Sequence, residues 1–313
     1  MDRFTNDDYY GDDGIPGSYP ERNTRFYEPP VRQRRGSGII YKLWRLMYPV
    51  LIHSFGIEII STVFVTLFLT LSVLAGMFLS ETAAYEFIYE NQIAISGAAE
   101  VIVFVPLLVF FMRDEQERKR SNPQGCLNKR KKSITDWLVI AGFIMSLLLL
   151  VNLLVSFMQL PGAENEQEIE ELYNMTSLWV QIIVVGIVAP FCEEMVFRGL
   201  IFRRLRDDVD PIYAALISAA AFGIYHGNVE QGVFAGILGF AFAMLYEHYG
   251  TIAVPIFCHM LNNFYATLAN ELYDAADFEM PDPVYFALLA GALVAVISLA
   301  IFIFRDDEKC NEY

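Results

Sequence analysis

The stretch Ala189-Pro-Phe-Cys-Glu-Glu-Met-Val-Phe-Arg-Gly199 places two adjacent carboxylates and a guanidinium inside a long apolar segment. These charged residues, Glu193, Glu194 and Arg198, lie within six positions of one another. A charged side chain in the hydrocarbon core of a bilayer costs at least ~3 kcal/mol, so such residues are rare and usually have a function or a partner. The stretch therefore predicts a membrane helix with a polar site built into it.

The composition of the whole chain is that of a polytopic membrane protein. Of its 313 residues, 55% are hydrophobic, and the mean hydropathy of +0.38 exceeds that of ordinary soluble domains. We therefore expect an all-α fold, a membrane helical bundle of about eight transmembrane helices. Eight apolar segments have the length needed to cross a bilayer, roughly 17 to 30 residues. They are 49–79, 93–112, 134–158, 178–202, 211–227, 231–247, 251–270 and 284–304.

The distribution of basic residues predicts the orientation of the bundle. If the N-terminus is inside, all 22 Lys and Arg residues except Arg198 fall in the inner segments, and the outer loops contain none. Cytoplasmic loops of membrane proteins are enriched in Lys and Arg, so we expect both termini in the cytoplasm. The simplest location is a bacterial plasma membrane. The basic run 129–132 is interpreted as a topology determinant, and binding of anionic lipid headgroups is a plausible addition.

Composition divides the chain into four parts. Residues 1–38 are rich in Tyr, Asp, Gly, Pro and Arg without an apolar period, which predicts a disordered cytoplasmic tail. Residues 39–133 are expected to form an N-terminal transmembrane hairpin and a basic cytoplasmic loop. Residues 134–270 contain the polar spans, and 271–313 the last helix with a short tail. No basic stripe with interleaved aromatic residues occurs, so nucleic acid is not an expected partner.

Two other apolar spans carry polar residues at helical spacing. The fifth span ends in Phe222-Gly-Ile-Tyr-His226, and the seventh contains His259-Met-Leu-Asn-Asn263. Residues four positions apart share one face of a helix. An aromatic ring is therefore expected beside the first imidazole, and an amide on the same face as the second. The three polar spans are predicted to meet around a hydrated cavity near the middle of the membrane.

The same spacing gives the two adjacent carboxylates different roles. Glu194 and Arg198 are four residues apart and can form an ion pair. Glu193 is turned by about 100° around the helix axis and cannot easily share that pairing face. A carboxylate without a matched cation is a candidate general base. The alternative interpretation of this pair of glutamates is an ion-pair network that only fixes helix packing.

Two carboxylates, two imidazoles and an amide suit the hydrolysis of an amide bond. A glutamate takes a proton from water, and one imidazole orients that water or protonates the leaving amine. A second imidazole and an amide donate hydrogen bonds to the developing oxyanion. This chemistry needs no Ser or Cys nucleophile.

The three motifs resemble those of the intramembrane glutamate proteases, which include the type II CAAX prenyl endopeptidases and bacterial bacteriocin-processing and immunity-associated proteins. The pattern Glu-Glu-x-x-x-Arg, Phe-x-x-x-His and His-x-x-x-Asn or Asp stands complete within 134–270. The resemblance implies that this region is an intramembrane protease core and that the protein is a metal-independent endopeptidase without a cofactor. Its partners would be the lipid bilayer and a membrane-associated peptide or protein, either CAAX-type prenylated or bacteriocin-like. By motif match the catalytic residues would be Glu193 and His226 for water activation and His259 and Asn263 for the oxyanion, with Glu194, Arg198 and Phe222 supporting the site.

Three alternatives remain open at this point. The first is a metalloprotease in which Glu193, His226 and His259 bind zinc, since catalytic zinc sites usually have three protein ligands of this kind. No His-Glu-x-x-His motif supports it. The second is a non-catalytic immunity or scaffold protein that binds a membrane partner. The third, a transporter, is weaker because no paired broken helices are visible.

Several other polar residues have simpler interpretations. His53 starts the first span without a partner pattern, and His248 ends the sixth span in an aromatic belt. Cys192 and Cys258 are expected to be small buried hydrophobes, with no disulfide or zinc pattern around them. Asn262 competes with its neighbour for the amide role, and the spacing from His259 favours the neighbour.

Overall fold

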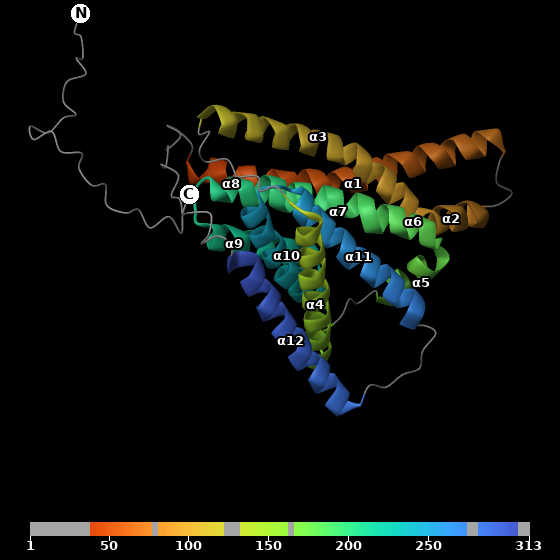
Figure 1. The fold of residues 1–313 in the computed structure, drawn as a ribbon. Helices are drawn as coiled ribbons and strands as arrows, with labels where there is room; N and C mark the ends of the chain where they lie inside the picture. The colour runs from red at the N-terminus through yellow and green to blue at the C-terminus, as the bar shows by residue number, and fades with distance from the viewer. Residues whose placement is uncertain (1–37, 77–80, 122–131, 162–165, 274–280, 306–313) are drawn as a thin grey trace, which may run out of the picture.

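The computed structural model describes residues 38–76, 81–121, 132–161, 166–273 and 281–305 (Figure 1). Within these ranges the chain is helical with short turns and contains no strand, which confirms the all-α prediction. The tail predicted for 1–38 lies outside them apart from Gly38, as does the basic run 129–132 apart from Lys132.

Each of the eight expected spans corresponds to a helix or to one continuous set of helical segments. Among the described residues, six of these are long and apolar enough to cross a membrane, α9 is apolar but shorter, and the helix of the seventh span is not among the six. The spans are α1 (Ile39–Ala75), α3 (Gln92–Ser121), α4 (Ile134–Met158), the segments from Leu178 to Arg206, α9 (Pro211–Tyr225), α10 (Val229–Tyr249), α11 (Ala253–Tyr273) and α12 (Asp282–Arg305).

Three features of the helix pattern differ from the prediction. Helix α1 begins ten residues before the predicted span, because the stretch before Pro49 contains good helix formers whose Lys and Arg lower its hydropathy. Two further helices, α2 (Glu81–Glu90) and α5 (Glu166–Met175), lie in the loops expected outside the membrane. These two are acidic, so a search for apolar runs passes over them.

The helix that carries the two adjacent glutamates is irregular. Its segments are α6 (Leu178–Ile183), the π-helical η2 (Val184–Val188), α7 (Ala189–Glu194), the π-helical η3 (Met195–Phe202) and α8 (Arg203–Arg206). In η2 the Ala189 N–H donates to the Val184 carbonyl, which leaves the Val185 carbonyl opposite Pro190. Proline has no N–H, so this carbonyl needs a donor from elsewhere. Single-turn π segments of this kind are frequent at functional sites.

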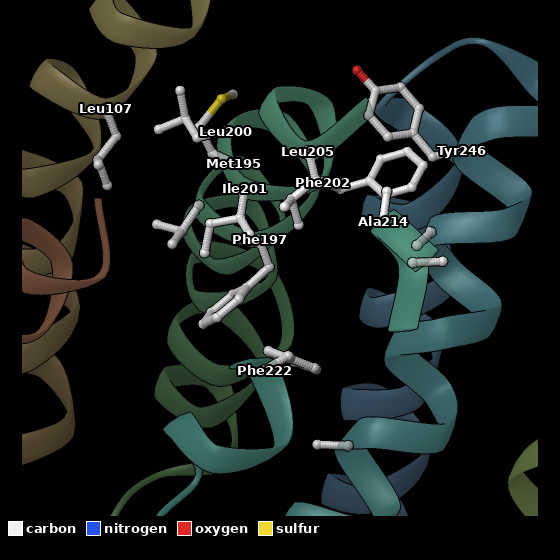
Figure 2. Close-up of a cluster of buried hydrophobic side chains, with 14 of the residues drawn as sticks. Leu107, Met195, Phe197, Leu200, Ile201, Phe202, Leu205, Ala214, Phe222 and Tyr246 are labelled. Atoms are coloured by element: carbon white, nitrogen blue, oxygen red, sulfur yellow. The ribbon is translucent and has the colours of Figure 1, made fainter. Parts of the chain in front are cut away.

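The hydrophobic core surrounds η3. Figure 2 shows its apolar side chains between α3 on one side and α9 and α10 on the other. Phe197 and Phe202 are fully buried, and Phe197 packs edge-on against Phe222 with ring centroids 4.8 Å apart. In a bilayer such packing stabilises the glutamate-bearing helix through van der Waals contact, because lipid tails are as apolar as these side chains.

Close backbone contact joins α9 and α10 into a hairpin. A Cβ atom added to Gly223 would lie 2.5 Å from the Gly232 carbonyl oxygen, so only glycine permits this approach. Helices α4 and α12 pack together as a second pair, and α1 and α3 as a third (Figure 1). Helix α11 contacts α4, α7, α10 and η2, which places its polar motif in the interior.

Ion pairs tie the start of α1 and the end of α3 to α8 and the turn that follows it. Arg204 donates to Asp114 at 2.6 Å and to the hydroxyl of Tyr48 at 2.5 Å. Arg118 donates to Asp207 at 2.9 Å. We call this set the basic-end cluster. Its members are Arg45, Tyr48, Asp114, Glu115, Arg118, Arg203, Arg204 and Asp207.

Candidate active site

The two adjacent glutamates and the histidine of α11 meet in the interior of the bundle. Glu194 Oε1 accepts a hydrogen bond from Arg198 Nη1 at 2.8 Å and a second from His259 Nδ1 at 2.9 Å. The side chains of Glu194 and Arg198 have no exposed surface. Glu194 therefore joins α7, η3 and α11 at a single carboxylate oxygen.

Aromatic rings surround the buried guanidinium of Arg198. Its central carbon lies 4.4 Å from the ring centroid of Phe222 and 5.4 Å from that of Phe242, within the range of cation–π attraction. A Cβ atom at Gly239 would lie 2.6 Å from Arg198 Nη2, so α10 needs a glycine there to admit the side chain. One carboxylate and two rings thus balance a charge that has no access to water.

Glu193 is placed differently from its neighbour. Its side chain is 16% exposed, whereas that of Glu194 is fully buried. Glu193 Oε2 lies 3.8 Å from His259 Nε2 and has no hydrogen-bond partner although it is buried. His259 therefore bridges the two carboxylates, one at each ring nitrogen. The one-residue offset along the helix separates a fully enclosed carboxylate from one that reaches the edge of the site.

Buried charged atoms without a partner are concentrated at this site. Among the side chains that the structure describes, they are Oε2 of Glu193, Oε2 of Glu194, and Nε and Nη2 of Arg198. An unpaired buried polar group is costly and calls for an explanation such as a catalytic role or a bound water. Glu193, Glu194 and Arg198 are therefore the described residues whose buried charges the protein itself satisfies least.

His226 lies at the end of α9 with one ring nitrogen already bound. Its Nδ1 donates to the carbonyl oxygen of Phe222 at 2.8 Å, and the two rings meet edge-on with centroids 4.7 Å apart. A carbonyl oxygen only accepts, so Nδ1 carries the proton and Nε2 of the neutral ring is an acceptor. Phe222 also contacts His259, with ring centroids 5.6 Å apart. The phenyl ring thus links the two imidazoles of the predicted site.

Asn263 satisfies the carbonyl that Pro190 leaves without a donor. Its Nδ2 donates to the Val185 oxygen at 2.7 Å. Asn262 Nδ2 in turn donates to Asn263 Oδ1 at 2.8 Å, which fixes the amide orientation. A primary amide has two N–H groups, so one remains for a ligand. The expected oxyanion donor is therefore also a structural partner of η2.

Helix α5 approaches the site from the end expected outside the membrane. Burial raises the pKa of the Tyr173 hydroxyl, and the negative charge of Glu193 raises it further. Tyr173 is half-buried, and its carbonyl accepts a hydrogen bond from the buried side chain of Gln181 at 2.8 Å. This contact anchors α5 to α6, the first segment of the glutamate-bearing helix.

The grouping of possible metal ligands can be compared with the zinc alternative in the described part of the chain. Within the described ranges, no three or more His, Cys, Asp or Glu side chains are grouped so that they could hold a metal ion. The proposed zinc ligands Glu193, His226 and His259 therefore do not form a ligand set. Cys192 and Cys258 are free and buried, in agreement with their interpretation as small hydrophobes.

A second buried polar group, next to the site, was missed by sequence reasoning. His53 on α1 donates through Nε2 to Glu100 on α3, at 3.2 Å, and its Nδ1 accepts from the Tyr225 hydroxyl at 2.9 Å. His53 therefore has partners, but they lie 47 and 172 residues away, where helical spacing cannot reveal them. Glu100 did carry a signal, since it is an acid within the predicted span 93–112.

The chain is similar to one protein family and to membrane proteins of two bacteria. The family model described as "Type II CAAX prenyl endopeptidase Rce1-like" matches residues 175–265. "Putative membrane peptidase YdiL" of Bacillus subtilis (strain 168) is 32% identical over 184 residues, 57% of this chain and 74% of that protein. "Membrane-embedded CAAX protease MroQ" of Staphylococcus aureus (strain USA300) is 24% identical over 185 residues, 54% of this chain and 74% of that protein. No solved structure matches the chain significantly.

Proposed function

Because the chain belongs to the Rce1-like family of type II CAAX prenyl endopeptidases, we propose that it cleaves a peptide bond of a membrane-associated substrate with water activated by Glu193. The family membership makes it an integral membrane protease. The glutamate mechanism and the kind of substrate are what we propose beyond that membership. The observation that carries the step is the unpartnered, buried Oε2 of Glu193, 3.8 Å from His259.

In the proposed reaction Glu193 removes a proton from water, and the oxygen of that water bonds to the carbonyl carbon of the scissile peptide. His226 accepts a hydrogen bond from the same water at Nε2, the nitrogen left free by its bond to the Phe222 carbonyl. This holds the water in line with the carbonyl, which is the main contribution of a positioned base. Protonated Glu193 then gives its proton to the leaving amine nitrogen as the carbon–nitrogen bond breaks.

His259 and Asn263 are proposed to stabilise the oxyanion of the tetrahedral intermediate. His259 Nδ1 donates to Glu194, so the proposed donation from Nε2 to the substrate oxygen requires a ring with a proton on each nitrogen. The Asn263 N–H that is not bound to Val185 supplies a second donor. Fixed donors in a site that excludes water are worth about 2.7–4 kcal/mol each in such reactions.

Glu194, Arg198 and Phe222 are assigned a supporting role. Glu194 fixes the ring of His259 through Nδ1, and Arg198 compensates the charge of that carboxylate. Phe222 contacts the guanidinium and both imidazoles. These contacts support preorganisation, because the side chains that touch substrate need to be held by their neighbours.

The test is cleavage of defined peptides by the purified protein in detergent. The probes are a fluorescence-quenched peptide ending in a farnesylated CAAX sequence and the same peptide without the prenyl group. Glu193→Gln should lower kcat by about 10²- to 10⁴-fold, because it removes the base and keeps the shape. Glu58→Gln is the matched control, since Glu58 is an exposed glutamate of α1 outside the site. Undiminished turnover by Glu193→Gln would refute the mechanism.

If neither peptide is cut, the substrate can be sought directly. Membrane proteomes of cells that carry the wild-type chain or Glu193→Gln should differ by fragments present only with the wild type. The prenylated and unprenylated peptides, together with any such fragment, separate a CAAX-type substrate from a bacteriocin-like one. Identical proteomes, combined with an unaltered cellular phenotype of Glu193→Gln, would favour the non-catalytic scaffold alternative.

Metal dependence has a separate test. Turnover in EDTA should equal turnover in buffer, because the proposed base and donors are all protein side chains. Loss of turnover in EDTA that zinc restores would replace the glutamate mechanism with the metalloprotease alternative.

A further inference from the structure

Two residues proposed to handle water are each preceded by a residue that contacts the N-terminal hairpin. Tyr225, directly before His226, donates its hydroxyl hydrogen to His53 on α1 at 2.9 Å. Cys192, directly before Glu193, donates through Sγ to the Glu100 carbonyl oxygen on α3 at 3.7 Å. The N-terminal hairpin thus contacts the residue directly before His226 and the residue directly before Glu193.

His53 and Glu100 also bind each other, which makes one continuous chain of contacts. The Glu100 carboxylate accepts from His53 Nε2 at 3.2 Å, so in the neutral ring Nδ1 is the acceptor for Tyr225. His53 is 1% exposed and Glu100 is 7% exposed. Burying three polar groups inside a membrane bundle is costly, and retaining them indicates a use beyond packing. Glu100 also lies close enough to Glu193 for their negative charges to interact.

We propose that Tyr225, His53 and Glu100 form a positioning arm, which extends from the N-terminal hairpin and holds His226 and Glu193 in their working geometry. The inference rests on the proposed function, because it concerns the same water-activating residues. None of the three residues of the arm is assigned contact with substrate. They act through neighbours: His53 holds Tyr225, which precedes His226, and the main-chain carbonyl of Glu100 holds Cys192, which precedes Glu193.

The geometry at the end of α9 explains why His226 needs such support. Tyr225 is the last residue of α9, His226 is its C-cap, and Gly227 follows with a φ of +78° at the turn. The Tyr225 and His226 rings meet edge-on with centroids 6.0 Å apart, and Tyr225 also packs on Phe197. A helix end before a glycine turn frays unless side chains fix it. The hydroxyl contact with His53 ties this end to α1.

Activity measurements separate positioning from a merely structural role. Tyr225→Phe removes one hydroxyl and keeps the ring, and it should lower kcat between about 10- and 100-fold with little change in KM, because a small misplacement of a catalytic group is costly. Tyr246→Phe is the control: this tyrosine is more deeply buried than the half-buried Tyr225 and packs on Phe202 in the core, and its variant should keep wild-type kcat.

A double-mutant cycle tests whether the arm acts as one unit. His53→Phe keeps an aromatic ring but removes both the donor to Glu100 and the acceptor for Tyr225. Tyr225→Phe added to His53→Phe should therefore cause no further loss of kcat, since coupled residues are non-additive. If the double variant instead loses kcat by the product of the two single losses, the positioning arm is refuted. Glu100→Leu, compared with Glu58→Leu, removes the side-chain acceptor for His53 and leaves the main-chain carbonyl that binds Cys192, and a wild-type kcat for Glu100→Leu would also overturn the arm.

Nuclear magnetic resonance of the ¹⁵N-histidine-labelled protein gives a readout that does not depend on turnover. The chain has four histidines, so each ring can be assigned by substitution. Tyr225→Phe should move the ring resonances of both His53 and His226 and leave those of His248 in place. Movement of His53 alone would overturn the proposal. If turnover depends on Glu193 but not on Tyr225, this inference fails while the proposed function stands; if no turnover depends on Glu193, the proposed function fails.

Discussion

The basic-end cluster and the active-site cluster are both built from buried Arg and acidic side chains, but they differ in how completely their charges are paired. Arg204 at the basic end donates to a carboxylate, a hydroxyl and a backbone carbonyl, and it stacks over the Tyr48 ring. Arg198 at the active site has one carboxylate contact, and its Nε and Nη2 have no partner. The first arrangement satisfies the charges. The second leaves buried atoms unpaired, which natural structures tolerate mainly where a function needs it.

The largest expected effect comes from removing the guanidinium of the active-site cluster. Arg198→Met should lower the free energy of unfolding by about 3–5 kcal/mol, because Glu194 would remain buried without its cation. Thermal unfolding in detergent, together with the amount of folded protein in the membrane, measures this loss. Unchanged stability would show that Phe222, Phe242 and His259 can hold the site without the ion pair.

A second substitution separates stability from activity in the same cluster. Glu194→Gln combined with Arg198→Met removes both charges and should recover part of the lost stability, since replacing a buried ion pair as a whole is often nearly neutral. Turnover should stay low, because His259 loses the carboxylate that fixes its ring. Recovery of full turnover would contradict the supporting role assigned to the pair.

A smaller loss of unfolding free energy is expected when the space around the Arg198 guanidinium is reduced. In Gly239→Ala the new Cβ would lie 2.6 Å from Arg198 Nη2 and 3.1 Å from a ring carbon of Phe222. Overpacking of this kind costs about 1–3 kcal/mol. The displacement should also lower turnover, since Arg198 and Phe222 contact the groups around His259.

Gly236→Ala is the matched control for this substitution. Gly236 lies on the same helix, and its added Cβ would meet the Ala219 oxygen at 3.8 Å, an ordinary contact distance. It should keep turnover and stability near those of the wild type. Equal losses in the two variants would mean that the helix backbone, and not the position of Arg198, determines the effect.

A substitution in the basic-end cluster should lower the free energy of unfolding and leave turnover unchanged. Arg204→Lys keeps the charge but loses the planar fork that binds Asp114, Tyr48 and a carbonyl together. The free energy of unfolding should fall by about 1–3 kcal/mol. Turnover per folded molecule, measured with the peptide cleaved by the wild type, should be unchanged. A loss of turnover larger than the loss of folded protein would tie this end of the bundle to the active site.

The sequence predicted those parts of the molecule that depend on local spacing. The four-residue spacing gave the Glu194–Arg198 pair and the contact of Phe222 with His226, because both are set by one helix. Apolar length gave the membrane helices for the same reason. The acidic helix α5 was not predicted, because it is short and amphipathic and a search for apolar spans does not find it.

Contacts between distant helices could not be predicted in the same way. The partners of His53 lie on two other helices, and nothing within the first span indicates them. The bond from Asn263 to Val185 depends on the π segment η2 and on Pro190, which leaves this carbonyl without a helical donor, so it requires knowledge of two helices at once. The catalytic assignments of Glu193, His226, His259 and Asn263 remain predictions.

The smallest effect is expected at a pair of charges in contact with solvent. Lys42 Nζ lies 2.6 Å from Asp208 Oδ1, but the two side chains are 43% and 39% exposed. Exposed ion pairs contribute roughly 0–1 kcal/mol, because water screens the attraction and two flexible side chains must be ordered. Lys42→Ala should therefore leave thermal unfolding and turnover within error of the wild type at moderate salt. A loss as large as that of Arg204→Lys would mean that distance matters more than burial in this protein, and the contrast between the paired and the unpaired clusters would lose its physical basis.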